Sequence, residues 1–197
     1  MKKRTVALLM AAVLLFGAAV GGTFAWLTAY TDPLVNTFTA GHVNITLSES
    51  NAVGNTKSFK MVPGATIEKD PTIAVLADSE ECYVYVKIQE TADLDTYISY
   101  TPAAGWTKMA ESDDHLTTVY YRLVNAVTAA AGTEFSVLTG NTVTVNNVSA
   151  DDMALVGEGD VQLIFTGYAV QKTADGGTTP EAAAAQAAWT AAGFGEI

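Results

Sequence analysis

Alternation of apolar and polar side chains is the feature that most constrains how this chain folds. Three windows show it most clearly: residues 43–47, 82–89 and 161–166. Because successive side chains of a β-strand point to opposite faces of a sheet, a period of two predicts half-buried strands. Thr and Val, which are common after residue 25, have branched side chains that suit this geometry. We predict further strands at residues 57–62, 71–77, 96–101, 117–124, 134–138 and 142–148.

Turn signals separate these predicted strands, and no helical pattern connects them. Val62-Pro63-Gly64 and Thr139-Gly140-Asn141 are two of the turn sequences. About nine short strands at this spacing favour an all-β fold. We therefore predict that residues 49–197 form an antiparallel two-sheet sandwich of the jelly-roll type.

The alanine-rich segment 182–192 predicts one short helix near the C-terminus. Thr179 can cap this helix, Pro180 suits its first position and Gly193 can end it. Trp189 is the largest side chain in the segment. We expect Trp189 to anchor the helix to the sandwich.

The N-terminus has the organisation of an export signal. Three basic residues at positions 2–4 precede an apolar run at residues 6–20 and a Gly21-Gly22 break. We predict that residues 1–25 are a signal peptide, cleaved between Ala25 and Trp26, which makes the protein secreted. The alternative is a retained membrane anchor, since residues 6–27 are long enough to span a bilayer. We favour cleavage because no basic cluster follows the apolar run, so membrane contact is expected only through the uncleaved signal.

Charge and cysteine content exclude several classes of protein. Removal of residues 1–25 leaves 7 Lys or Arg and 21 Asp or Glu, so the net charge changes from −11 to −14. A chain this acidic is not expected to bind nucleic acid. Its single cysteine excludes an internal disulfide.

Motifs for catalysis are missing from the sequence. His42 and His115 are 73 residues apart, and neither stands in a metal-binding motif. No nucleophile elbow, phosphate loop or dinucleotide fingerprint occurs. Acidic clusters at residues 93–95, 111–114 and 151–160 could bind calcium, but none has the spacing of a calcium loop, and solvated loops explain them better. We predict no enzyme activity, no catalytic or metal-binding residues and no cofactor.

The predicted strand at residues 82–89 carries the remaining candidates. Cys82 could act as a thiol nucleophile, but it shares a face with Val84 and Val86, which favours core packing. Tyr83 and Tyr85 share the opposite face, which we expect to point outward. Either sheet packing or a partner surface would use these two rings.

Several segments of the chain resemble one family of exported proteins. The segments are Gly21-Gly22-Thr23-Phe24-Ala25-Trp26-Leu27-Thr28, Asn36-Thr37-Phe38-Thr39-Ala40-Gly41, Val43-Asn44-Ile45-Thr46-Leu47, Val62-Pro63-Gly64 with Lys69-Asp70-Pro71, Cys82-Tyr83-Val84-Tyr85-Val86-Lys87 and Gly167-Tyr168-Ala169-Val170-Gln171. Together they resemble the TasA/camelysin family of bacterial biofilm-matrix fibre subunits. The resemblance implies a signal that is read by a specialised signal peptidase of the endoplasmic-reticulum type. The metallopeptidase activity associated with the camelysin name is not carried over, because neither histidine stands in a ligand motif.

The resemblance also implies a mode of assembly. In that family, the segment after the signal is implied to leave its own subunit and complete a sheet of the next one. Here this arm is residues 26–48, and its apolar side chains for donation are Val35, Phe38, Val43, Ile45 and Leu47. The expected partner is a second copy or a related matrix subunit. The residues alone leave open that the same segment is the first strand of its own monomer.

Two other functions remain open at this point. One is a secreted adhesin or binding module that does not polymerise and uses the outward tyrosines or a loop. The other is a secreted hydrolase with carboxylate or serine chemistry that no motif reveals.

Overall fold

The computed structural model describes residues 3, 5–8, 10–12, 41–50, 52, 57–157, 159–173, 179–195 and 197. The chain divides into two compact units, Met1–Thr39 and Ala40–Ile197. The described residues of the first unit are helical. The predicted cleavage site and two predicted donor residues, Val35 and Phe38, lie outside the described residues. In the described part of the chain, no helix combines the length and the apolar character needed to cross a bilayer.

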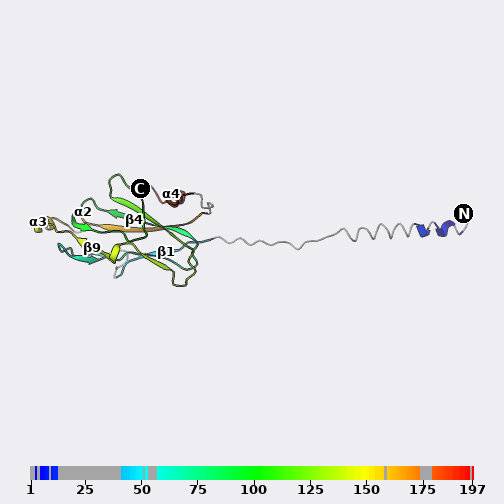
Figure 1. Ribbon diagram of the computed structural model, residues 1–197, viewed down its shortest axis with the longest axis horizontal. Coiled ribbons are helices and arrows are strands. Elements are labelled where there is room, and N and C mark those ends of the chain that lie inside the picture. The colour runs from blue at the N-terminus through cyan, green and yellow to red at the C-terminus, as the bar shows by residue number, and fades with distance from the viewer. Residues whose placement is uncertain are drawn as a thin grey trace. The chain divides into compact units, whose positions relative to one another are not determined.

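The second unit is an all-β sandwich of antiparallel sheets with a short C-terminal helix, as predicted (Figure 1). Its described strands are β1 (Ile45–Ser48), β2 (Thr66–Glu68), β3 (Thr72–Val75), β4 (Cys82–Glu90), β5 (Ile98–Ser99), β6 (Thr107–Glu111), β7 (Thr117–Val124), β8 (Thr133–Ser136), β9 (Thr142–Val145) and β10 (Leu163–Gln171). Its described helices are α2 (Leu94–Tyr97), α3 (Ala150–Met153), α4 (Glu181–Ala192) and the 3-10 turn η1 (Thr139–Asn141).

One layer is a four-stranded sheet in the order β10-β4-β7-β6. The nine-residue strand β4 lies between β10 and β7, and Tyr85 stands opposite Tyr168 on one side and Tyr121 on the other. The inner set of β4 side chains, Cys82, Val84, Val86 and Ile88, is completely or almost completely buried. These residues form the core with side chains of the other layer.

The second layer consists of two three-stranded sheets, β1-β3-β8 and β2-β9-β5. The central strands of one sheet continue into strands of the other, which forms long rows. Strand β2 leads into β3, and β8 leads through η1 into β9. Backbone bonds bridge the breaks, because Lys69 N–H donates to Asn141 O at 2.8 Å and Val137 N–H donates to Pro71 O at 2.9 Å. The layer therefore has four rows, with β1 and β5 at its opposite edges.

The predicted strands differ from the observed ones in three places. Residues 57–62 form no strand, although burial alternates along them as predicted. The predicted strand at 96–101 is divided between α2 and the two-residue strand β5. Strands β2 and β6 were not predicted, because neither is long enough or regular enough in sequence to show a clear period of two.

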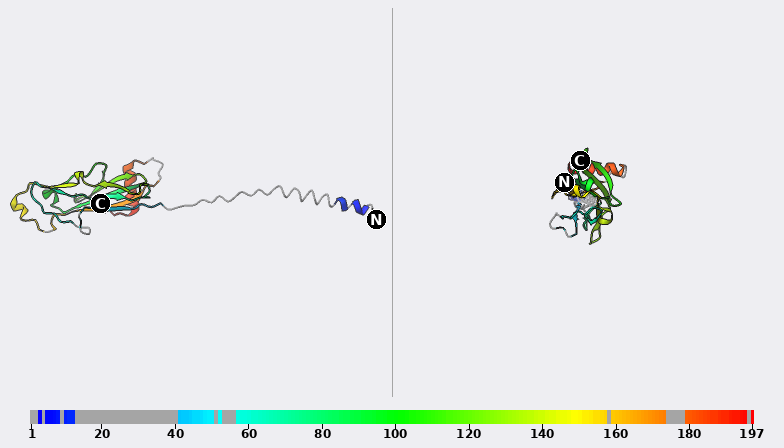
Figure 2. Two further views of the ribbon diagram at one scale, coloured as in Figure 1. Left: turned by 90° about the horizontal axis from the view of Figure 1, so that it is seen from below. Right: turned by 90° about the vertical axis from the view of Figure 1, so that its left-hand side faces the viewer.

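Helix α4 covers the outer face of the four-stranded sheet and corrects the prediction for Tyr83 and Tyr85. Figure 2 shows α4, in orange-red, lying crosswise to the strands. Tyr83 and Tyr85 are 2% and 0% exposed, so the face predicted to point outward is buried. Tyr85 OH donates to the carbonyl of Ala185 at 2.9 Å. Ala185 has a side chain small enough to let the helix backbone reach this hydroxyl group.

Trp189 anchors the helix, as predicted. Its ring lies 5.1 Å from that of Tyr85, 5.1 Å from that of Tyr168 and 5.2 Å from that of Phe194, all edge to face. Gly193 ends the helix in the left-handed conformation, with φ of 69°. The predicted cap is wrong, because Pro180 precedes the first helical residue and no side chain caps this end.

Candidate assembly site

The edge of β10 presents a row of backbone groups. Just beyond the two ends of the β10–β4 ladder, Thr91 N–H donates to Gln162 O at 3.2 Å and Lys172 N–H donates to Glu81 O at 2.8 Å. Alternate residues of an antiparallel strand face its partner, so the even-numbered residues of β10 direct their backbone groups to β4. The odd-numbered residues direct theirs away from β4; they are Leu163, Phe165, Gly167, Ala169 and Gln171. Among the described strands, none pairs with β10 on this side.

Length and composition distinguish the β10 edge from the edge strands β1 and β6. Strand β1, at an edge of the other layer, is also uncharged but is four residues long. Strand β6, at the opposite edge of the same sheet, is interrupted by a register shift and carries Lys108 and Glu111. Bulges and charges of this kind keep edge strands from pairing with other chains. Strand β10 is nine residues long and has no charged residue or proline. It is therefore the sheet edge best suited to receive another strand.

Strand β1 lies next to this edge but belongs to the other layer. It pairs with β3, from Ile45 opposite Val75 to Ser48 opposite Thr72. A Cβ atom added to Gly167 would lie 3.6 Å from Ile45 Cδ1 and 3.7 Å from Leu47 Cβ. The side chains of β1, together with Ile73 of β3 at 3.5 Å, thus fill the space that the missing side chain at Gly167 leaves between the layers.

The structure brings three of the predicted donor residues together. Ile45 and Leu47 lie in β1, and Val43 precedes it; Val43 and Ile45 pack against the core, whereas Leu47 is 37% exposed. The predicted arm, residues 26–48, therefore overlaps at β1 with the compact unit Ala40–Ile197. Pairing of β1 within its own chain was the alternative left open by the sequence.

A cluster of charged residues, which we call the clasp, holds the chain where β1 ends. Lys69 Nζ lies 2.5 Å from a carboxylate oxygen of Glu49 and within 5.4 Å of the centre of the Phe165 ring. Ser50 N–H donates to Asp70 at 3.2 Å, and Lys57 Nζ donates to the carbonyl of Ser50 at 2.9 Å. The clasp thus connects the end of β1 to the start of β3 and to β10.

Hydrogen bonds from Ser50 lower the pKa of Asp70, and the nearby charge of Lys57 lowers it further. The unfolded chain, with a carboxyl pKa of about 3.9, binds a proton before the folded chain does. The stability that Asp70 contributes is therefore complete above about pH 4 and is lost as the pH falls through the lowered folded value.

We expect Asp70→Asn to reduce the free energy of unfolding by on the order of 1 kcal/mol at neutral pH, because the carboxylate is only partly shielded from water. The difference from the unchanged chain should shrink as the pH falls below about 4, and it should vanish once Asp70 is protonated in both the folded and the unfolded chain. Urea unfolding followed by circular dichroism between pH 2.5 and 7 measures this difference. A constant difference over the whole range would contradict the assignment.

The remaining candidates have structural positions. Cys82 is completely buried, and burial raises the pKa of its thiol to about 11, which argues against a reactive nucleophile. His115 Nδ1 lies 3.0 Å from Glu111 in an exposed turn, and His42 is exposed near β1. Over the described ranges, no three His, Cys, Asp or Glu side chains gather as a metal site would require. Burial of Tyr83 and Tyr85 removes one of the two surfaces named for the adhesin alternative; the other, a loop, is unaffected by this burial.

Sequence reasoning missed two parts of this site. The strand prediction ended at residue 166, before Gly167, although the uncharged run continues to Gln171. The clasp joins residues that are about 20 positions apart, and its charges show no period in the sequence. The uncharged run could have been recognised in the sequence, but the clasp could not.

No family model matches this chain, and no curated protein or solved structure matches it significantly.

Proposed function

We propose that the protein is a secreted structural subunit that assembles into extracellular, biofilm-type matrix fibres. Assembly occurs when the segment before β1 of one subunit adds to the β10 edge of the next. The observation that carries this proposal is the nine-residue, uncharged β10 edge, on which five residues direct their backbone groups away from β4. The resemblance of the N-terminal segments to fibre subunits supplies the class of assembly.

The direction of the chain suits this addition. Strand β10 runs from Leu163, opposite Glu90, to Gln171, opposite Cys82, and Gly41 lies beside Gln171 and Glu80. The described part of the second unit therefore begins at the Gln171 end of β10. If the Leu163 end of the next subunit stacks against the Gln171 end of this one, the arm of this subunit enters the next one and runs antiparallel to its β10. Every other pairing between the described strands is also antiparallel.

We also assign the sandwich to the jelly-roll class. Its layers read β1, β2–β3, β8–β9 and β5 in one, and β10, β4, β7 and β6 in the other. Along the sequence, the chain thus crosses repeatedly from one layer to the other, as the wrapped hairpins of a jelly roll do. In such a fold the first and last strands lie close together, which accounts for the position of β1 beside β10.

The experiment that tests the function uses the processed chain, residues 26–197, with a change at the proposed edge. We expect the unchanged chain to form fibres by negative-stain microscopy and Ala169→Pro to form none. Proline removes the outward N–H of Ala169 but leaves the ladder to β4, because edge positions tolerate proline. The matched variant Ala169→Val keeps the N–H and should still assemble. Thermal unfolding confirms that both variants fold, and fibres of Ala169→Pro equal to those of the unchanged chain would refute the proposed edge.

Assembly should also strengthen as salt is added. Each processed subunit carries a net charge of −14, so subunits repel one another at low ionic strength. Raising the salt concentration from about 0.02 to 0.2 M shortens the screening length to below about 10 Å. We expect the concentration needed for fibres, measured by sedimentation, to fall several-fold. Stronger assembly at low salt would show that ion pairs, rather than strand addition, drive the association.

A further inference from the structure

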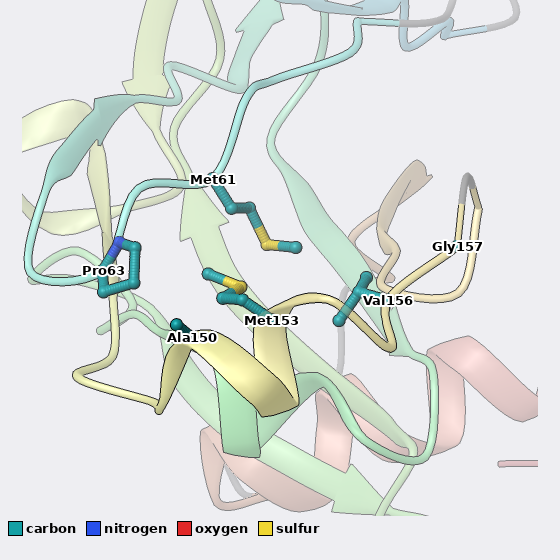
Figure 3. Close-up of a pocket in the computed structure, with 6 residues that line it drawn as sticks. All are labelled: Met61, Pro63, Ala150, Met153, Val156 and Gly157. Atoms are coloured by element: carbon teal, nitrogen blue, oxygen red, sulfur yellow. The ribbon is translucent and has the colours of Figure 1, made fainter.

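An open hollow lies between the loop that leads to β2 and helix α3. Its volume is about 500 Å³, and it is lined by Met61, Pro63, Ala150, Met153, Val156 and Gly157. Figure 3 shows the side chains of Met61 and Met153 pointing toward one another across it. None of the lining residues carries a charge. We call this the methionine pocket.

Its chemistry suits an aromatic side chain. Methionine side chains are flexible and unbranched, so they adapt to the shape of a ring, and their sulfur atoms make favourable contacts with ring edges. Pro63 and Val156 supply further apolar surface. A pocket of this size is large enough for one aromatic side chain.

The pocket and the start of the second unit lie at opposite ends of the four-stranded sheet. Gly41 lies beside Gln171, at the end of β10. Helix α3 comes before β10 in the chain and lies at the other end of this unit, away from the start of β1 (Figure 1). Nine residues of strand separate these ends, which is about 30 Å. A pocket at one end and a departing chain at the other are complementary when copies stack end to end.

The length of chain before Gly41 decides which side chain reaches the pocket. Phe38 is three residues from Gly41 and so lies within about 10 Å of it. Trp26 is fifteen residues away and can extend about 50 Å, which is farther than the whole β10 edge. Between Val35 and Val43, Phe38 is the one large apolar side chain. Phe38 is therefore the aromatic residue that this length of chain would bring to the junction between stacked copies.

We infer that the methionine pocket of each subunit receives Phe38 of the neighbouring copy. This inference rests on the proposed end-to-end assembly and specifies one of its contacts. Strand addition along β10 fixes the direction of the arm, and insertion of Phe38 fixes its register. A strand with one face buried is sensitive to a slip of one residue, so one inserted ring is enough to define the pairing.

The test compares two variants that add the same charge two residues apart, one at the last residue of α3 and one in the turn that follows it. Met153→Glu places a carboxylate in the pocket, whereas Leu155→Glu places one on a side chain that is 79% exposed and does not line it. We expect Met153→Glu to raise the critical concentration for fibres of residues 26–197 at least tenfold. Leu155→Glu should change it less than threefold, and Phe38→Ser should have the same effect as Met153→Glu.

Crosslinking provides a second measurement that does not depend on a charged variant. In a Cys82→Ala background, one batch carries Phe38→Cys and another Met153→Cys, and the two are mixed before assembly. In fibres, a short bismaleimide should crosslink the Phe38→Cys chain to the Met153→Cys chain. When a Thr28→Cys chain replaces the Phe38→Cys chain, the yield of crosslinked product should be far lower. Absence of the first crosslink in fibres, or equal effects of Met153→Glu and Leu155→Glu, would overturn the inference. Failure of the unchanged chain to polymerise would instead overturn the proposed function.

Discussion

Deletion of residues 26–40 from the processed chain should abolish fibres completely and leave a folded monomer. The reason is that β1 pairs with β3 inside the compact unit Ala40–Ile197, so the deletion ends before the sandwich begins. The donated segment would be lost while the β10 edge stays intact. Negative-stain microscopy and size-exclusion chromatography, with circular dichroism to confirm the fold, measure the outcome.

A longer deletion supplies the contrast. Removing residues 26–48 also removes β1, which would uncover Ile73 and the space above Gly167. We expect this variant to lose several kcal/mol of stability, because exposing buried aliphatic side chains costs about 1.5–3 kcal/mol each. If the shorter deletion still forms fibres, the segment before Gly41 is not the donated strand. If the longer deletion remains as stable as the shorter one, β1 does not contribute to the sandwich.

Replacement of Trp189 by alanine should cause the largest loss of stability of any single change considered. Trp189 is 2% exposed and contacts the rings of Tyr85, Tyr168 and Phe194, and its indole N–H donates to Gly195 O at 2.9 Å. Truncation of a buried tryptophan costs about 3–5 kcal/mol. For a chain of this length the melting temperature should fall by on the order of 10 °C. Differential scanning calorimetry measures both quantities.

The neighbouring residue provides a matched control. Thr190 is exposed, and its hydroxyl donates to the carbonyl of Gln186 in its own helix at 3.0 Å. Thr190→Ala should therefore change the melting temperature by less than about 2 °C. Trp189→Phe should be intermediate, because it keeps part of the ring packing. A loss below about 1 kcal/mol for Trp189→Ala would show that α4 contributes little to the fold.

The strands that were predicted correctly have clear local patterns. Strand β4 alternates over residues 82–89, and its predicted bounds agree closely with the observed ones. The predicted strand at 117–124 has the bounds of β7. Alternation predicts to which face each side chain points, but it does not predict which strand pairs with the segment. Residues 57–62 show this limit, since their burial alternates although no described strand pairs with them.

The tyrosines of β4 show a second limit of sequence reasoning. A period of two identifies two faces but does not tell whether the second face meets water or another element. Tyr83 and Tyr85 face α4, which lies about 100 residues later in the chain. The helix and its anchor Trp189 were both predicted from the sequence, but the face that the helix covers depends on tertiary packing alone.

The candidate site depends on the same kind of long-range information. Its edge follows from the position of β10 as the last strand of the sandwich, which no local pattern encodes. Its donor residues were proposed from a resemblance, and the structure places Ile45 and Leu47 inside the unit. The clasp and the methionine pocket were not predicted, because each brings together segments from separate parts of the chain.

The placement of the β10 edge and the start of the chain on different parts of one subunit has a consequence for growth. A contact between two unlike surfaces joins subunits head to tail, so a fibre built from it has polarity. One tip always exposes an unfilled edge, and the other always exposes an unattached arm. The two tips should then elongate at different rates, and a chain that lacks its arm would stop growth at one tip only.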